Sequence, residues 1–241
     1  MKTIVITNLK GGVGKTTSAV NLGYSMVTLG KRVLLVDADP QSNLTPFFVK
    51  SHGYSGRTIQ EVFRSPEKIR NIIARTKYEN IDIIKGSVKL KEADASDEKA
   101  LGAALSQVRQ EYDICIIDTR PAVEAVTRSA LLAGDVFLTP VQLENFCRDN
   151  LSLLEDELTG IAYEKDATWR IFANMVINKR SQLAIYTDMV QKHDWSFMEN
   201  CISRSEVVNN ALQRYKPVMK HRRSSRVAKD YLELAKELLE V

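Results

Sequence analysis

The chain has 241 residues, of which 44% are hydrophobic and 27% are charged, and its formal net charge is +4. These values are typical of an ordinary soluble globular protein, and no apolar run approaches the length of a membrane span. The first residues lead directly into a strand and do not resemble a signal peptide. The three cysteines are widely spaced and form no C-x-x-C pair. This spacing excludes a disulfide framework or a cysteine zinc site, and we expect a cytoplasmic location.

Short apolar runs alternate with amphipathic segments along the chain. Strands are expected over residues 3–7, 33–36, 81–84, 114–117, 136–140 and 169–177. Helices are expected over residues 16–29, 92–111, 123–133, 150–162, 182–192 and 224–239, and residues 43–80 are less regular and mostly helical. This alternation predicts an α/β fold with a mostly parallel, twisted sheet and helices on both faces. The length fits a single domain over residues 1–241.

A glycine-rich stretch, LKGGVGKTT, joins the first strand to the first helix. Backbone N–H groups in such a turn can cradle phosphates, and the helix start adds partial positive charge. Lys15 can reach the β- and γ-phosphates, and the Thr16 hydroxyl can hold Mg²⁺. The pattern departs from a standard phosphate loop because Leu9 replaces the first glycine and Lys10 adds a second cation. The expected ATP-binding residues of this stretch are Lys10, Gly11, Gly12, Val13, Gly14, Lys15, Thr16 and Thr17.

Further polar residues follow the predicted strands at their carboxyl ends, where open parallel sheets bind ligands. Asp37 and Asp39 follow one apolar strand, Asp118 closes a second, and Asn178 follows a third. Asp118 at the end of an apolar run is the usual position of a Mg²⁺-binding carboxylate. Each aspartate could instead be a helix cap or a turn residue. Beside a phosphate loop, the metal-binding interpretation is favoured.

The stretch KGGVGKTT at residues 10–17 resembles the deviant Walker A motif of the ParA/MinD family of partition and positioning ATPases, and the ParA/Soj-type members are the most similar. Residues 33–45, 112–131, 176–180, 202–211 and 224–238 also resemble segments of this family. The resemblance implies a single-domain P-loop NTPase that binds ATP and Mg²⁺ and hydrolyses ATP slowly without a partner. It further implies a homodimer that sandwiches the nucleotides.

The resemblance also implies roles for particular residues. Lys10 matches the signature lysine that acts across the dimer, and Asp39 matches the aspartate that positions the attacking water. Asp37 then belongs to the outer shell of the metal, and Asn178 matches an asparagine that contacts adenine. Arg120 departs from the family, because it replaces the first proline after Asp118.

A basic stretch at residues 216–229 carries no acidic residue, and such a local excess can attract phosphate backbones. In ParA-type relatives, arginines that match Arg204 and Arg226 contact DNA without reading its sequence. Two further departures lie here, since Ser203 and Ser224 replace a proline and an arginine of the family pattern. The expected DNA-binding residues are Arg204, Lys220, Arg222, Arg223 and Arg226. A solvated helix face is the alternative interpretation.

The sequence therefore predicts an ATP-dependent dimerising switch that binds nonspecific double-stranded DNA and is stimulated by a ParB-like partner. Its cargo could be a plasmid, an integrated element, a chromosome origin or a protein assembly. A MinD-like membrane switch is an alternative, but the last helix carries Asp230, Glu233, Glu237 and Glu240 on its polar face, which disfavours anionic lipid. A metabolic or metal-chaperone relative is disfavoured by the placement of the cysteines.

Overall fold

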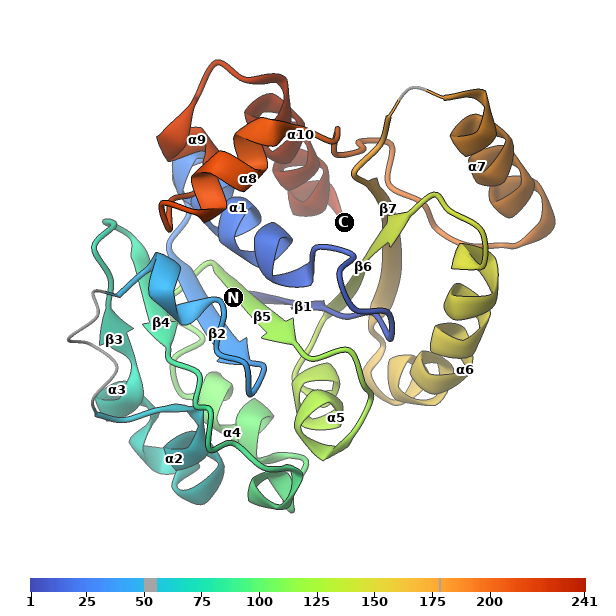
Figure 1. Ribbon diagram of the computed structural model, residues 1–241. Coiled ribbons are helices and arrows are strands. Elements are labelled where there is room, and N and C mark those ends of the chain that lie inside the picture. Colours follow the sequence, from blue (N-terminus) through green and yellow to red (C-terminus); the bar gives the residue numbers. More distant parts are fainter. Residues whose placement is uncertain (50–55, 178) are drawn as a thin grey trace.

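The computed structural model describes residues 1–49, 56–177 and 179–241. Its framework is one seven-stranded sheet with the strand order β3-β4-β2-β5-β1-β6-β7 (Figure 1). All neighbouring strands pair in parallel except β3, which is an antiparallel edge strand on β4. The strands are β1 (Lys2–Ile6), β2 (Val33–Ala38), β3 (Ala74–Arg75), β4 (Ile81–Ile84), β5 (Ile114–Thr119), β6 (Val136–Gln142) and β7 (Thr168–Asn174).

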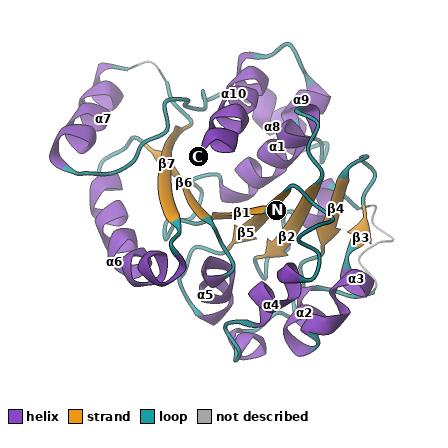
Figure 2. Ribbon diagram, turned by 180° about the vertical axis from the view of Figure 1, so that it is seen from behind, coloured by secondary structure: helices purple, strands orange, loops and turns teal. Residues whose placement is uncertain are grey.

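Helices cover both faces of the sheet (Figure 2). One face carries α1 (Lys15–Thr28), α8 (Glu206–Leu212), α9 (Val218–His221) and α10 (Arg226–Glu240). The other carries α2 (Ile59–Arg64), α3 (Ile69–Ile72), α4 (Ala100–Ser106), α5 (Ala125–Leu132) and α6 (Cys147–Lys165), while α7 (Arg180–Lys192) lies beyond β7. Short 3₁₀ turns add Thr45–Phe47, Pro66–Lys68 and Glu92–Ala95. The predicted α/β class and the helices on both faces are confirmed.

The central strands are apolar because both of their faces are covered. Every residue of β2 and β5 is buried, and their side chains alternate between two core clusters on opposite sides of the sheet. The α10 helix contributes Val227, Tyr231 and Leu234 to the cluster that also contains α1. No helix within the described ranges is long and apolar enough to span a membrane.

The predicted helix over residues 92–111 is wrong, because the chain there is divided. A 3₁₀ turn at Glu92–Ala95 is followed by α4, which spans only Ala100–Ser106. The Asp94 carboxylate accepts a hydrogen bond from the Lys91 amide at 2.9 Å, and the Asp97 carboxylate accepts one from the Lys99 amide at 3.0 Å. The Asp94 bond caps the start of the 3₁₀ turn, and the Asp97 bond forms a turn just before α4, so the segment begins two short elements instead of one helix.

The predicted strand over residues 169–177 is too long at its carboxyl end. Strand β7 ends at Asn174, and Met175 adopts a left-handed backbone with φ of 54°. Asn174 therefore occupies the carboxyl rim of this strand. The position of Asn178 lies outside the described residues.

Candidate functional site

The loop between β1 and α1 brings the Gly-rich stretch to the carboxyl rim of the sheet (Figure 1). Gly12 and Gly14 adopt positive φ angles of 77° and 94°, a conformation that favours glycine. A Cβ atom on Gly14 would lie 2.5 Å from the Asn174 side-chain nitrogen, so a larger residue cannot fit without rearrangement. The loop is thus shaped by both backbone conformation and close approach of β7.

Lys15 points back into this loop. Its Nζ atom donates to the carbonyl oxygens of Asn8 at 3.0 Å and Lys10 at 3.1 Å. Burial lowers the pKa of the Lys15 ammonium, and the nearby charges of Asp118 and Asp39 oppose this shift. The ammonium group is therefore held inside the loop, where a phosphate chain could replace the two carbonyl contacts.

Asp118 lies at the centre of the rim and is fully buried. Among the described residues, neither of its carboxylate oxygens has a hydrogen-bond partner, although the Thr16 hydroxyl lies close enough to affect its pKa. Burial raises the pKa of Asp118 well above its usual range, Asp37 raises it further, and Thr16 opposes the shift. Buried carboxylates normally have partners, so these two oxygens are available to a bound group.

Asp37 lies beside Asp118 in the sheet register and is fully buried. Its Oδ2 atom accepts from the Thr45 amide at 2.8 Å and from the Thr45 hydroxyl at 2.6 Å, whereas Oδ1 has no partner. Burial raises the pKa of Asp37 to about 6, although the bonds from Thr45 oppose the shift. The Thr45 hydroxyl in turn accepts from the Gly86 amide at 2.9 Å. Asp37 thus ties the segment after β2 to the end of β4.

Asp39 is nearly buried and follows β2 directly. Its Oδ1 atom accepts a hydrogen bond from the Gln41 amide at 2.8 Å, which fixes the turn after the strand. Its charge acts on both Lys15 and Asp118, which places the three side chains in one electrostatic group. The fold therefore brings the three predicted carboxylates, Asp37, Asp39 and Asp118, together with the loop.

Asn174 is a site residue that the sequence interpretation missed. Its side-chain nitrogen donates to the Val13 carbonyl at 2.7 Å, and it borders a cavity of about 140 Å³. The cavity runs from Thr17 to residues 202–206 and to Tyr231 of α10. The signal for Asn174 was present, because it also follows the apolar strand, but the strand end was placed at the later asparagine.

Lys10 lies at the outer edge of the loop. Its Nζ atom pairs with Glu144 Oε2 at 3.1 Å, and both side chains are substantially exposed. The Lys10 amide donates to Asn8 Oδ1 at 2.8 Å, which fixes the loop backbone beneath it. Exposed ion pairs contribute little free energy, so the Lys10 side chain can leave Glu144 readily.

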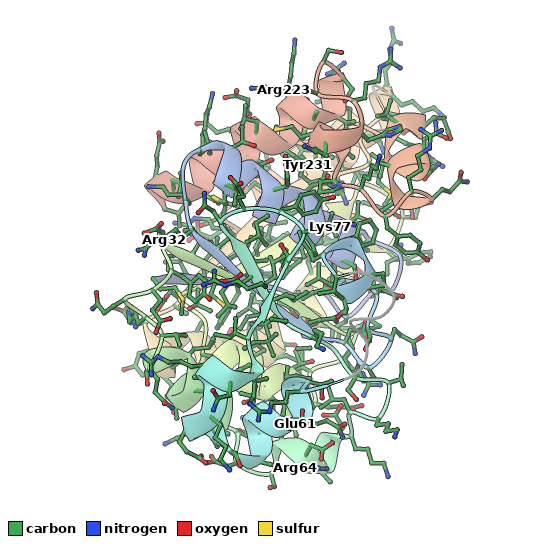
Figure 3. All side chains as sticks on the ribbon, turned by 90° about the vertical axis from the view of Figure 1, so that its left-hand side faces the viewer. Arg32, Glu61, Arg64, Lys77, Arg223 and Tyr231 are labelled. Carbon is green, nitrogen blue, oxygen red and sulfur yellow. The ribbon has the colours of Figure 1, made fainter. Side chains whose placement is uncertain are left out.

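One of the predicted basic residues, Arg204, lines the cavity beside Asn174. Arg204 precedes α8, Lys220 belongs to α9, Arg222 and Arg223 follow it, and Arg226 begins α10. All five are exposed. Figure 3 shows Arg223 at the opposite end of the molecule from Glu61 and Arg64 of α2.

Comparison with known proteins agrees with this geometry. A family model described as an AAA domain matches residues 1–171. Sporulation initiation inhibitor protein Soj of Bacillus subtilis (strain 168) is 34% identical over 247 residues, covering 98% of each chain. The chain belongs to the ParA/MinD family of ATPases. Virulence plasmid ParA family protein pGP5-D of Chlamydia psittaci is 31% identical over 246 residues, which cover 99% of this chain and 94% of the relative.

A solved structure shows the same fold. A McdA variant from Cyanothece in complex with ATP superposes with a TM-score of 0.85 at 23% identity, covering 100% of this chain and 97% of that chain. The likeness extends over the whole sheet and its helices, which confirms the P-loop NTPase fold. ATPase activity follows from membership of the family.

Proposed function

We propose that this chain is a ParA-type switch that binds ATP and Mg²⁺, dimerises, and holds nonspecific DNA while it positions a plasmid, a chromosome or another cargo. The observation that carries the nucleotide site is the buried, unpartnered Asp118 carboxylate beside Lys15 and Thr16. The relatives named for a virulence plasmid and for sporulation support a role in partition.

The donor set fits Mg²⁺ bound together with ATP. No cluster of three or more acidic, histidine or cysteine side chains suited to a metal occurs among the described residues. Mg²⁺ is usually held by one or two carboxylates, with phosphates and waters completing its shell, so such a cluster is unnecessary. Thr16 and Asp118 would hold the ion, with Asp37 in the outer shell, and the ion would neutralise charge on the phosphates.

The remaining residues of the rim have separate proposed roles. The Gly11–Gly14 backbone and Thr17 cradle the phosphates, Lys15 contacts the β- and γ-phosphates, and Asp39 orients the attacking water. The cavity beside Asn174 is the proposed place of the adenine ring, because Thr17, in the first turn of α1, lines it together with Asn174. Asn178 stays a proposed adenine contact.

Lys10→Ala is expected to bind ATP as a monomer, because the cation that reaches the partner's nucleotide is lost while the loop backbone remains. The dimer is measured by size-exclusion chromatography with light scattering in ATP and Mg²⁺. Glu144→Ala is the matched control, since it removes the other half of the ion pair and leaves the cation free. If Lys10→Ala dimerises over the same range of protein concentration as the wild type, Lys10 does not act on the nucleotide of the partner subunit.

The proposed DNA surface consists of Arg204, Lys220, Arg222, Arg223 and Arg226. These exposed cations have no ion-pair partner within the described ranges of the chain. Cations without a protein partner are free to neutralise phosphates and release counterions. A sandwich dimer doubles this surface, so binding to DNA should require ATP, and the protein should associate with the nucleoid in that state.

Charge reversal of Arg222, Arg223 and Arg226 to glutamate should weaken binding to all DNA sequences about equally and leave ATP affinity unchanged. The dimer loses six phosphate contacts, which reduces the slope of log affinity against log salt by about 5. Binding to two unrelated duplexes at several salt concentrations, with and without ATP, measures this effect. Reversal of Lys89, Arg109 and Lys165, which are also exposed and have no ion-pair partner within the described ranges, is the matched control. ATP-dependent binding at wild-type affinity by the triple variant would refute the proposed surface.

A ParB-like or other adaptor protein is the proposed activator, because the site has no strong general base and should turn over slowly alone. The MinD-like alternative needs an apolar helix face that is free for lipid. In α10 that face is buried, since Val227, Tyr231 and Leu238 pack in the core cluster shared with α1. We therefore keep the DNA-binding proposal ahead of a membrane role.

A further inference from the structure

Arg120 follows Asp118 by two residues and lies where the family pattern has a proline. Proline would fix φ at this position and arginine does not, although the following Pro121 still favours an extended backbone at Arg120. The loop runs from Thr119, the last residue of β5, to the start of α5. Its upstream end is fixed, because the buried Thr119 hydroxyl donates to the Ile6 carbonyl at 2.9 Å. A second attachment, near the start of α5, would help to fix the backbone of this loop beside Asp118.

The Arg120 guanidinium supplies that second attachment. Its Nη1 atom contacts Glu92 Oε1 at 2.8 Å and Glu124 Oε2 at 3.0 Å. All three side chains are partly exposed, with the arginine 33% and Glu92 31% exposed. The two acidic partners come from different elements, the 3₁₀ turn at Glu92–Ala95 and the N-cap of α5.

Glu92 is the centre of this network. Its second oxygen, Oε2, accepts a hydrogen bond from the Val126 amide at 2.9 Å in the first turn of α5. Glu124 is the N-cap residue of α5 but makes no capping bond of its own, since its side chain turns to Arg120. Glu92 thus replaces the local cap and joins the first turn of α5 to Arg120.

We propose that Arg120 is a positioning residue for ATP hydrolysis, which fixes the loop after Asp118 by clamping it to Glu92 and Glu124. The clamp replaces the backbone restriction of the missing proline with an ionic restraint. It acts through Asp118, so it rests on the role proposed above for that carboxylate.

The test compares kcat for ATP hydrolysis with nucleotide affinity. Arg120→Ala should lower kcat by about tenfold and change the Kd for ATP by less than about threefold, because a small displacement of reacting groups slows chemistry more than binding. Arg120→Lys should recover part of the loss, since one ammonium can still contact Glu92. Glu92→Gln keeps an oxygen for the Val126 amide but loses the charge, so it should resemble Arg120→Ala.

The double variant Arg120→Ala/Glu92→Gln should be no slower than either single variant, because both changes break one clamp. Arg128→Ala is the matched control: this arginine of α5 pairs with Glu98 at 2.9 Å with similar exposure, but it lies outside the loop. Its kcat should equal that of the wild type. Unchanged kcat in Arg120→Ala, equal loss in Arg128→Ala, or additive losses in the double variant would each overturn the inference.

The same measurements separate this inference from the proposed function. If Asp118→Ala retains Mg²⁺-dependent hydrolysis, the proposed metal site fails. If Asp118→Ala is inactive and Arg120→Ala turns over at the wild-type rate, the metal site stands and only the clamp fails.

Discussion

Replacing Lys15 with alanine will abolish measurable ATP binding. The Lys15 ammonium is buried in the loop, where two backbone carbonyls already hold it. A bound phosphate chain therefore contacts a cation whose side chain loses little further conformational freedom. Each hydrogen bond to a charged group contributes about 1.5–3 kcal/mol, so the loss of two raises Kd by at least about 100-fold. Calorimetry with ATP and Mg²⁺ measures the change.

The alanine variant also removes a buried cation that lies near Asp118 and Asp39. Lys15→Met is therefore needed beside it, because methionine keeps most of the volume and restores packing without restoring charge. Both variants should lose ATP, and circular dichroism reports whether they stay folded. Lys192→Ala, which removes an exposed lysine of α7, should bind as the wild type does. A folded Lys15→Met protein with wild-type affinity would remove the phosphate-loop assignment.

The loop and its neighbouring strands could be predicted because their signals are local. Residues 10–17 combine positive-φ glycines, a lysine and two threonines between a strand and a helix, and each feature is visible in the sequence. Apolar runs such as residues 33–36 and 114–117 mark strands that are buried on both faces. The position of Asp37 and Asp118 follows directly, because parallel strands end on one rim.

Other features depend on tertiary contacts and could not be predicted. The capping of α5 by Glu92 joins residues 34 positions apart, and no local pattern signals it. The choice between Asn174 and a later asparagine depends on where β7 leaves the sheet, and Met175 decides this through a left-handed backbone. The division of the segment at residues 92–111 differs from these, because the hydrogen bonds of Asp94 and Asp97 are local, and only the hydrophobic periodicity suggested one continuous helix.

The last prediction concerns the free energy of unfolding of the nucleotide-free protein. Burial raises the pKa of Asp118 in the folded state, while in the unfolded chain it returns to its ordinary value near ~4. The folded state therefore binds the proton more tightly, and stability falls as pH rises above about 4. The raised pKa of Asp37, about 6, has the same sign, but its contribution ends near that pH. Because the Asp37 charge contributes to the raised pKa of Asp118, the slope of stability against pH above ~4 belongs to the two carboxylates together.

Asp118→Asn should therefore unfold at higher urea concentration than the wild type, with a difference that grows as pH rises above ~4 in the presence of a chelator. Asn titrates in neither state, so it removes this part of the slope, and it should also lose Mg²⁺-dependent ATP binding. Asp113→Asn is the matched control. Hydrogen bonds from Arg32 lower the pKa of Asp113, so replacing this carboxylate should destabilise the protein. Parallel plots of the free energy of unfolding against pH for the wild type and Asp118→Asn would contradict this assignment. They would show that burial of the Asp118 carboxylate does not reduce stability as the pH rises.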